Sequence, residues 1–170
     1  DRYASIGTSW PVLIDERTPE MIDILQKNGS KVIALTAIVS GESNYDDSHE
    51  VKRFKDLKSV GFDFSSSFPK NSSIKLTDIP PYMGNHPVFY NGILISNGEG
   101  MDKNTKGPAL ISFLKKIGWK PKSVILIDDK TPNFASVRNS LECYDNSIDF
   151  HGIHYTGGID FITNHVEEDT

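Results

Sequence analysis

The sequence has little of several things, and each shortage excludes a class of protein. It has a single cysteine, Cys143, so no disulfide can form within the chain and a disulfide-stapled scaffold is excluded. No apolar run approaches the roughly 20 residues that a membrane-spanning helix needs. Basic residues are in the minority, with 18 Lys plus Arg against 23 Asp plus Glu and a net charge of −5. We therefore expect no nucleic-acid binding, because phosphate backbones are recognised through a positive field.

The composition that is present is typical of one folded domain. The 170 residues are 37% hydrophobic and 24% charged, and domains of about 100–200 residues commonly build a sizeable core. The chain begins at Asp1 rather than at a methionine and carries no signal-like segment. We therefore expect it to be a piece of a longer protein, and its cellular compartment stays open.

Two helix-and-strand pairs dominate the hydrophobic pattern. The first pair predicts a helix over residues 18–29, with Thr18 as its N-cap, and a buried strand over 31–37. The second predicts a helix over 108–118 and a strand over 123–127. Helices that alternate with continuous apolar strands favour the α/β class, in the form of a three-layer Rossmann-like parallel sheet.

The remaining elements are shorter. They are helices over 51–60 and 132–141, a strand over 150–155, a hairpin over 88–95, and polar loops over 40–50 and 65–73. Asn91-Gly92 is the favoured two-residue type I′ turn between two apolar runs. We expect this hairpin to be a small antiparallel insertion in an otherwise parallel sheet.

Polar residues stand where such a sheet places its ligands. Open parallel sheets bind ligands at the carboxyl ends of their strands. Thr36 ends the first strand, Asp128 and Asp129 follow another, and Lys106 starts the intervening helix. Each has an ordinary structural interpretation: a local cap for Thr36 and the aspartates, and a solvent-exposed side chain for Lys106. Together they suit a phosphate and Mg²⁺, which prefers carboxylate oxygens plus substrate phosphate.

The same segments resemble three motifs of the haloacid dehalogenase-like superfamily of phosphohydrolases. VIALTA (32–37) is similar to its second motif, NTKGPA (104–109) to its third and VILIDDKTPN (124–133) to its fourth, which is the most specific. The order and rough spacing agree, over about residues 18–155. The segments LIDERTPEMIDILQ and ALTA also resemble a bacterial branch of that superfamily with no assigned function.

The resemblance implies a Mg²⁺-dependent phosphomonoesterase that acts on a phosphorylated small molecule through an aspartyl-phosphate intermediate. Thr36 and Lys106 would be its catalytic residues and would bind phosphoryl oxygens. The implied site has four residues at the substrate and two at the metal: Thr36, Ala37, Lys106 and Asn133 for the substrate, and Asp128 and Asp129 for Mg²⁺.

The superfamily's first motif is absent. That motif is a strand ending in Asp-x-Asp, which supplies the covalent nucleophile and the acid/base, and no apolar strand here ends in that way. Either an N-terminal segment of the same protein carries it, or the chain is a catalytically inactive binding or effector module. We favour the first, because the other motif residues are present. Ile38 also stands where the bacterial branch often has Arg.

The resemblance also implies a domain organisation. Residues 1–17 would be the linker from the missing N-terminal segment, and 18–160 the α/β core, with a cap-like or hairpin insertion around 40–97. Residues 161–170 would form a C-terminal tail.

Two other interpretations are less favoured. A phosphate-accepting receiver-like domain also has an acidic pair, a Thr and a Lys near a parallel sheet, but its acidic pair normally comes early in the chain. The five histidines show no tight metal spacing. His151 and His154 would face opposite sides of a strand, so we expect no zinc site there.

Overall fold

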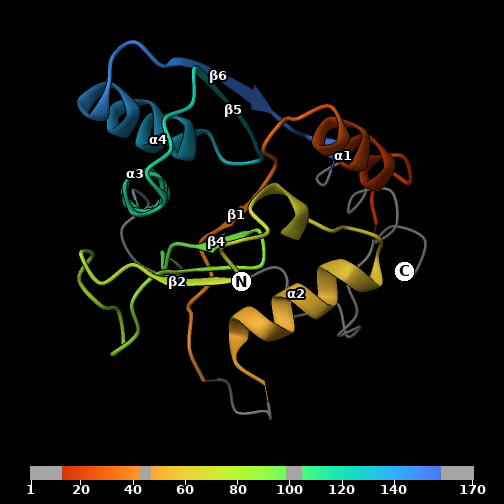
Figure 1. Ribbon diagram of the computed structural model, residues 1–170, viewed down its shortest axis with the longest axis horizontal. Helices are drawn as coiled ribbons and strands as arrows, with labels where there is room; N and C mark the ends of the chain where they lie inside the picture. The colour runs from red at the N-terminus through yellow and green to blue at the C-terminus, as the bar shows by residue number, and fades with distance from the viewer. Residues whose placement is uncertain (1–12, 43–46, 99–104, 158–170) are drawn as a thin grey trace, which may run out of the picture.

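The computed structural model describes residues 13–42, 47–98 and 105–157, and its architecture is mixed α/β (Figure 1). The helices are α1 (Thr18–Lys27), α2 (His49–Ser59), α3 (Lys106–Ile117) and α4 (Thr131–Tyr144), with a 3-10 turn η1 (Ser65–Ser67). The strands are β1 (Ala34–Thr36), β2 (Ser73–Lys75), β3 (Val88–Tyr90), β4 (Ile93–Ile95), β5 (Ser123–Asp128) and β6 (Asp149–His154).

Four strands form a mixed sheet in the order β1-β4-β3-β2. The predicted hairpin is confirmed as β3 and β4, and both turn residues have the positive φ of a type I′ turn, 44° at Asn91 and 87° at Gly92. A Cβ at Gly92 would lie 2.3 Å from the carbonyl of Phe64, so glycine is required there. The hairpin joins the sheet directly, because β4 pairs in parallel with β1.

Helices cover both faces of this sheet. Val88, Ile93 and Ile95 pack toward Phe54 and Leu57 of α2. The alternate residues of the same strands, which include Phe89 and Leu94, pack into the cluster that contains α3. The sheet is therefore apolar on both sides at β3 and β4, which explains why these two strands show continuous apolar runs rather than alternation.

The second sheet is a parallel pair, β5 and β6, in which Asp128 lies opposite His154. The predicted α/β class is confirmed, but the described residues do not form one continuous parallel sheet, because β5 and β1 belong to different sheets. Within residues 13–42, 47–98 and 105–157, each of these two strands has one strand neighbour and one unpaired edge. Helix α4 covers one side of the pair.

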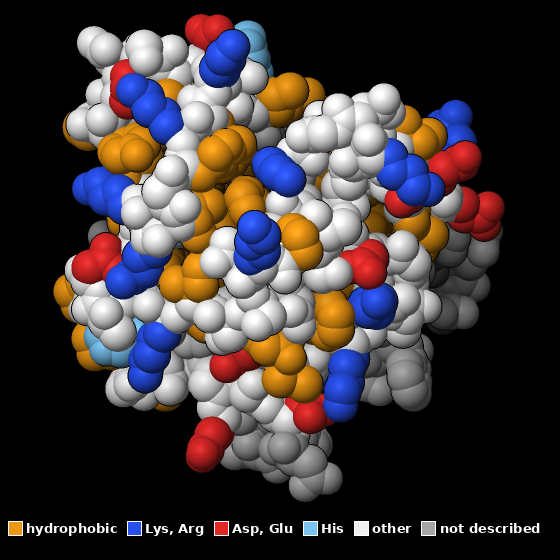
Figure 2. All heavy atoms as spheres, viewed as in Figure 1, with side chains coloured by type: hydrophobic (Ala, Val, Ile, Leu, Met, Phe, Trp, Pro, Cys, Tyr) orange, Lys and Arg blue, Asp and Glu red, His pale blue; other side chains and the backbone are white. Residues whose placement is uncertain are grey.

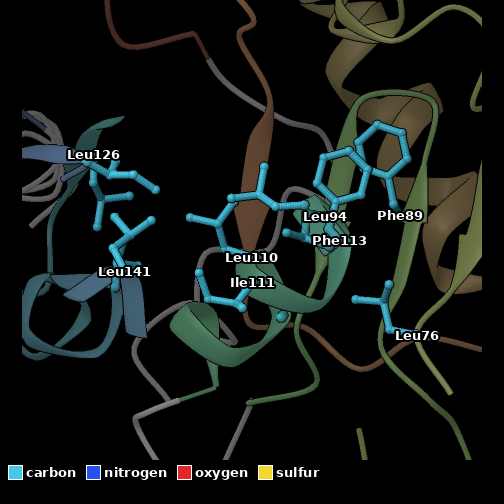
Figure 3. Close-up of a cluster of buried hydrophobic side chains, with 12 residues drawn as sticks. Leu76, Phe89, Leu94, Leu110, Ile111, Phe113, Leu126 and Leu141 are labelled. Carbon is cyan, nitrogen blue, oxygen red and sulfur yellow. The ribbon is translucent and has the colours of Figure 1, made fainter. Parts of the chain in front are cut away.

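One buried cluster connects the two sheets. Figure 3 shows Leu110 of α3 between the side chains of Leu126 and Leu141 and that of Leu94, and all four belong to this cluster. Phe89 and Phe113 stack at its other end, with ring centroids 4.2 Å apart. Helix α3 is thus the central packing element of the fold.

Several element ends differ from prediction. Helix α1 has Arg17 as its N-cap and Thr18 as its first residue, without a side-chain capping bond, so the predicted Thr18 cap is wrong. Helix α3 begins at Lys106, two residues before Pro108, because proline is well tolerated within a first turn. Strand β1 is shorter than predicted, and β2 was not predicted, because Ile74 is the only apolar residue in it.

Apolar side chains remain exposed around the second sheet. Ile125 and Ile127 of β5 are both 62% exposed and point to the side of the strand away from Leu126. Ile153 of β6 and Met21 of α1 are also exposed. Figure 2 shows hydrophobic side chains gathered on the viewed face over the region of α3, α4 and β5. Among the described helices, none is long and apolar enough to cross a bilayer.

Candidate active site

Lys106 and Asp128 meet at the start of α3. The Lys106 ammonium donates to Asp128 Oδ2 over 2.5 Å. The lysine side chain is 11% exposed and that of the aspartate 4%. The ordinary interpretation of Lys106 as a solvent-exposed helix residue is therefore wrong. A buried ion pair is seldom retained for stability alone, because desolvation of both charges opposes their attraction.

Asp128 is held from three directions. Besides Lys106, its Oδ1 accepts from Asn133 Nδ2 over 2.8 Å and from the Lys130 amide over 2.9 Å. Burial alone raises the pKa of the Asp128 carboxyl, but these hydrogen bonds outweigh it and hold the pKa below its ordinary value of 3.8. The carboxylate is thus ionised at neutral pH and fixed in orientation.

A hydroxyl bridge connects this ion pair to the end of β1. The Thr36 carbonyl accepts from Ser96 Oγ over 3.1 Å, and Ser96 Oγ lies 3.0 Å from Thr105 Oγ1, one residue before Lys106. Because Ser96 donates to the carbonyl, Thr105 is the donor to Ser96. Thr105 is the N-cap residue of α3, yet its hydroxyl makes no capping bond. It serves instead to join α3 to the first sheet.

The residues after β1 are held by the chain that leaves β4. The Ala37 carbonyl accepts from Gly98 N over 2.8 Å, and the Ile38 carbonyl accepts from Asn97 N over 3.2 Å. The Thr36 hydroxyl accepts only a long contact, 3.5 Å, from Ile38 N. The main chain at Ala37 is therefore fixed beside a Thr hydroxyl that remains able to donate to a ligand.

Asp129 occupies a different position from Asp128. Asp129 is exposed, and its side chain is not part of the Lys106–Asp128 network. Its carbonyl accepts from His154 Nε2 over 3.2 Å, which anchors the acidic loop to the end of β6. The carboxylate of Asp129 is free to meet a ligand from solvent.

The carboxylates of Asp128 and Asp129 are the type of ligand that Mg²⁺ prefers. Both are hard oxygen donors, and Mg²⁺ usually binds one or two protein carboxylates and keeps several waters. Three hydrogen bonds reach Asp128, two at Oδ1 and one at Oδ2, which leaves a lone pair of Oδ2 for a cation. The two aspartates would have to act together with water or substrate oxygens, because nowhere in the described residues are three or more His, Cys, Asp or Glu side chains grouped to hold a metal.

The structure therefore joins Lys106, Asp128 and Asn133 directly and connects Thr36 to them through the Ser96–Thr105 bridge. Ala37 is held separately by Gly98, and the exposed Asp129 lies outside this network. Ser96 and Thr105 were missed from the sequence. Ser96 directly follows the apolar run of β4. The strand-end rule that selected Thr36 would have selected Ser96 as well.

Comparison with known proteins places the chain among bacterial relatives of uncharacterised function. It is 30% identical over 145 residues to a protein of Rickettsia bellii, covering 84% of this chain and 48% of that protein. It is 31% identical over 139 residues to a protein of Rickettsia prowazekii, covering 81% of this chain and 45% of that protein. The chain thus spans a little under half the length of these relatives.

No solved structure matches the chain significantly. The family described as a protein of unknown function, DUF2608, matches residues 5–161. Since that match spans more than half of the sequence, the chain belongs to the DUF2608 family.

Proposed function

We propose that this chain is part of a Mg²⁺-dependent phosphomonoesterase of the haloacid dehalogenase-like type. The observation that carries the proposal is the buried Lys106–Asp128 pair, with Asn133 on the same carboxylate and Thr36 joined to the same helix start. An ammonium, a hydroxyl and ionised carboxylates at one sheet end are the groups that phosphoryl transfer requires.

Each residue has a role that follows from its contacts. The Lys106 ammonium has three donors and gives one to Asp128, so it can give another to a phosphoryl oxygen. The Thr36 hydroxyl and the main chain at Ala37 would bind the same phosphoryl group. Asn133 keeps the Asp128 carboxylate in orientation. Asp128 and Asp129 would hold Mg²⁺, which supplies neutralisation of the phosphate charge when bound.

The nucleophile would come from an additional apolar strand ending in Asp-x-Asp. β1 and β5 each have one unpaired edge among the described strands, and their carboxyl ends are joined to the start of α3. A strand inserted between them would pair with both open edges and complete a three-layer Rossmann-like sheet. The relatives are about twice as long as the matched region, so their additional residues are numerous enough to include the strand that ends in Asp-x-Asp.

A second candidate is a catalytically inactive module that binds a phosphorylated ligand or acts as an effector. It is favoured by one observation: Lys106 and Asp128 already neutralise each other in the chain as it stands. In this case the same residues would bind ligand without turnover. Measurement of hydrolysis separates the two candidates.

The test is made on the protein encoded by the complete reading frame. With Mg²⁺ it is expected to hydrolyse a generic phosphomonoester such as para-nitrophenyl phosphate. Asp128→Ala is expected to lower kcat by at least about a hundredfold, because a charge-stabilising group is lost. The matched control is Asp145→Ala, since Asp145 lies at the far end of α4 and accepts from Ser147. Equal activity of the two variants would refute the metal assignment.

A further inference from the structure

Helix α3 lies unusually close to α4 at one point, Gly107. A Cβ built on Gly107 would lie 2.1 Å from the Ser136 carbonyl oxygen and 2.4 Å from Ser140 Oγ, whereas ordinary contact begins near 3.4 Å. The nearest obstacle is main chain rather than a movable side chain. Any larger residue at 107 would therefore push α3 away from α4.

The same residue is hydrogen-bonded across the contact. The amide of Gly107 belongs to the first turn of α3, where N–H groups lack partners within the helix. It donates to Ser136 Oγ over 3.0 Å, and Ser136 is buried. The bond fixes the distance and the rotation of the α3 start relative to α4.

Both helices carry a site residue next to this contact. Lys106 immediately precedes Gly107 on α3. Asn133 lies three residues before Ser136 on α4, so the two share one face of that helix. Lys106 and Asn133 then converge on Asp128 from the two helices, on opposite carboxylate oxygens. The α3–α4 contact therefore determines how closely the two donors approach the same carboxylate.

We infer that Gly107 and Ser136 form a positioning contact that holds the Lys106 ammonium against Asp128. Neither residue is expected to touch the substrate. Replacement of either separates α3 from α4 or lets it rotate, which loosens the lysine while Asp128 and Asn133 stay in place. This inference uses only the helix contact, and its effect on turnover rests on the proposed phosphomonoesterase function.

The test measures how well Lys106 is protected from an amine-reactive acetylating reagent: the folded chain is exposed briefly, and mass spectrometry of its digested peptides gives the extent of reaction at each lysine. Lys106 is expected to react far more slowly than Lys120, whose side chain is 58% exposed. Ser136→Ala is expected to raise the Lys106 rate by about tenfold through local opening, without changing the Lys120 rate.

The matched control is Ser112→Ala. Ser112 is also a buried serine and donates to Asp78 Oδ1 over 2.7 Å, but its bond is remote from the start of α3. It is expected to lower stability comparably and to leave Lys106 protected. An unchanged Lys106 rate in Ser136→Ala, or an equal rise in Ser112→Ala, would overturn the inference.

Gly107→Ala is the more drastic variant and can fail to fold, so Ser136→Ala decides the question. In the longer protein, Ser136→Ala is also expected to lower kcat while Ser112→Ala does not. If Lys106 becomes reactive but no phosphatase activity exists in the parent protein, the positioning contact stands and the proposed function fails. If the parent protein has phosphatase activity but Lys106 stays protected in Ser136→Ala, the proposed function stands and the positioning contact fails.

Discussion

Strands β4 and β5 have nearly the same apolar sequence and very different surroundings. The three residues of β4, Ile93, Leu94 and Ile95, are at most 1% exposed. In β5, Ile125 and Ile127 are each 62% exposed, although Leu126 between them is buried. β4 has a strand on each side and a helix on each face, whereas β5, within the part of the chain that the structure describes, has one strand neighbour and α4.

An apolar run predicts burial only where the elements that would cover it are present. Apolar residues at both alternations of a strand are typical of burial on both faces. For β4 the partners needed for that burial are in the described chain. For β5 they are missing on one face and one edge, as expected if a further segment of the protein packs there in our proposal.

The largest loss of stability is expected in the buried strand β4. Leu94→Ala is expected to cost about 3–4 kcal/mol of unfolding free energy, because it leaves a cavity in the core. Ile127→Ala, on the exposed side of β5, is expected to cost less than about 1 kcal/mol. Denaturant unfolding of both variants provides the measurement. Equal losses would mean that Ile127 is buried in solution.

A smaller loss of unfolding free energy is expected when the Lys106–Asp128 ion pair is broken. Lys106→Met keeps the aliphatic stem but leaves Asp128 without its cation, which is expected to cost about 3 kcal/mol. Lys120→Met is the control, because its pair with Asp145 is exposed on the lysine side and such pairs contribute less than about 1 kcal/mol. A Lys106→Met cost as low as the control's would contradict the buried pair.

The smallest effect concerns acid stability. Because the pKa of Asp128 is lowered in the folded chain, its contribution is present above the ordinary value of 3.8 and is lost as pH falls through the lower folded pKa. Asp128→Asn is therefore expected to flatten the decline of stability below pH 3.8. Asp63→Asn, at a surface aspartate whose pKa is also lowered, serves as comparison. No change of slope in Asp128→Asn would contradict the assignment.

The sequence predicted the helices and most strands because their apolar periodicity is strong. It predicted the Lys106–Asp128 proximity because the start of a helix and the end of the strand that follows it lie at the same edge of an α/β sheet. It did not predict β2, since a lone Ile74 between polar residues carries no period. It also missed Ser96, which its place at a strand end would have indicated, and Gly107, whose role depends on which elements become neighbours. Contacts between distant segments leave no local pattern, so only the fold reveals them.

The candidate site also combines features that the sequence predicts with features that only the fold reveals. Thr36 was selected by its place at a strand end, and its link to Lys106 through Ser96 and Thr105 appears only in the assembled structure. The nucleophile strand stays a prediction, because it rests on resemblance and on unpaired edges.

One measurement tests the account most directly: the rate of phosphomonoester hydrolysis with Mg²⁺, compared between this 170-residue chain and the protein of the complete reading frame. The account predicts turnover by the longer protein and none by the chain alone, because the additional strand supplies the nucleophile at the open edges of β1 and β5. Equal turnover by both would place the nucleophile inside this chain and contradict the account. No turnover by either would leave a binding module in place of an enzyme.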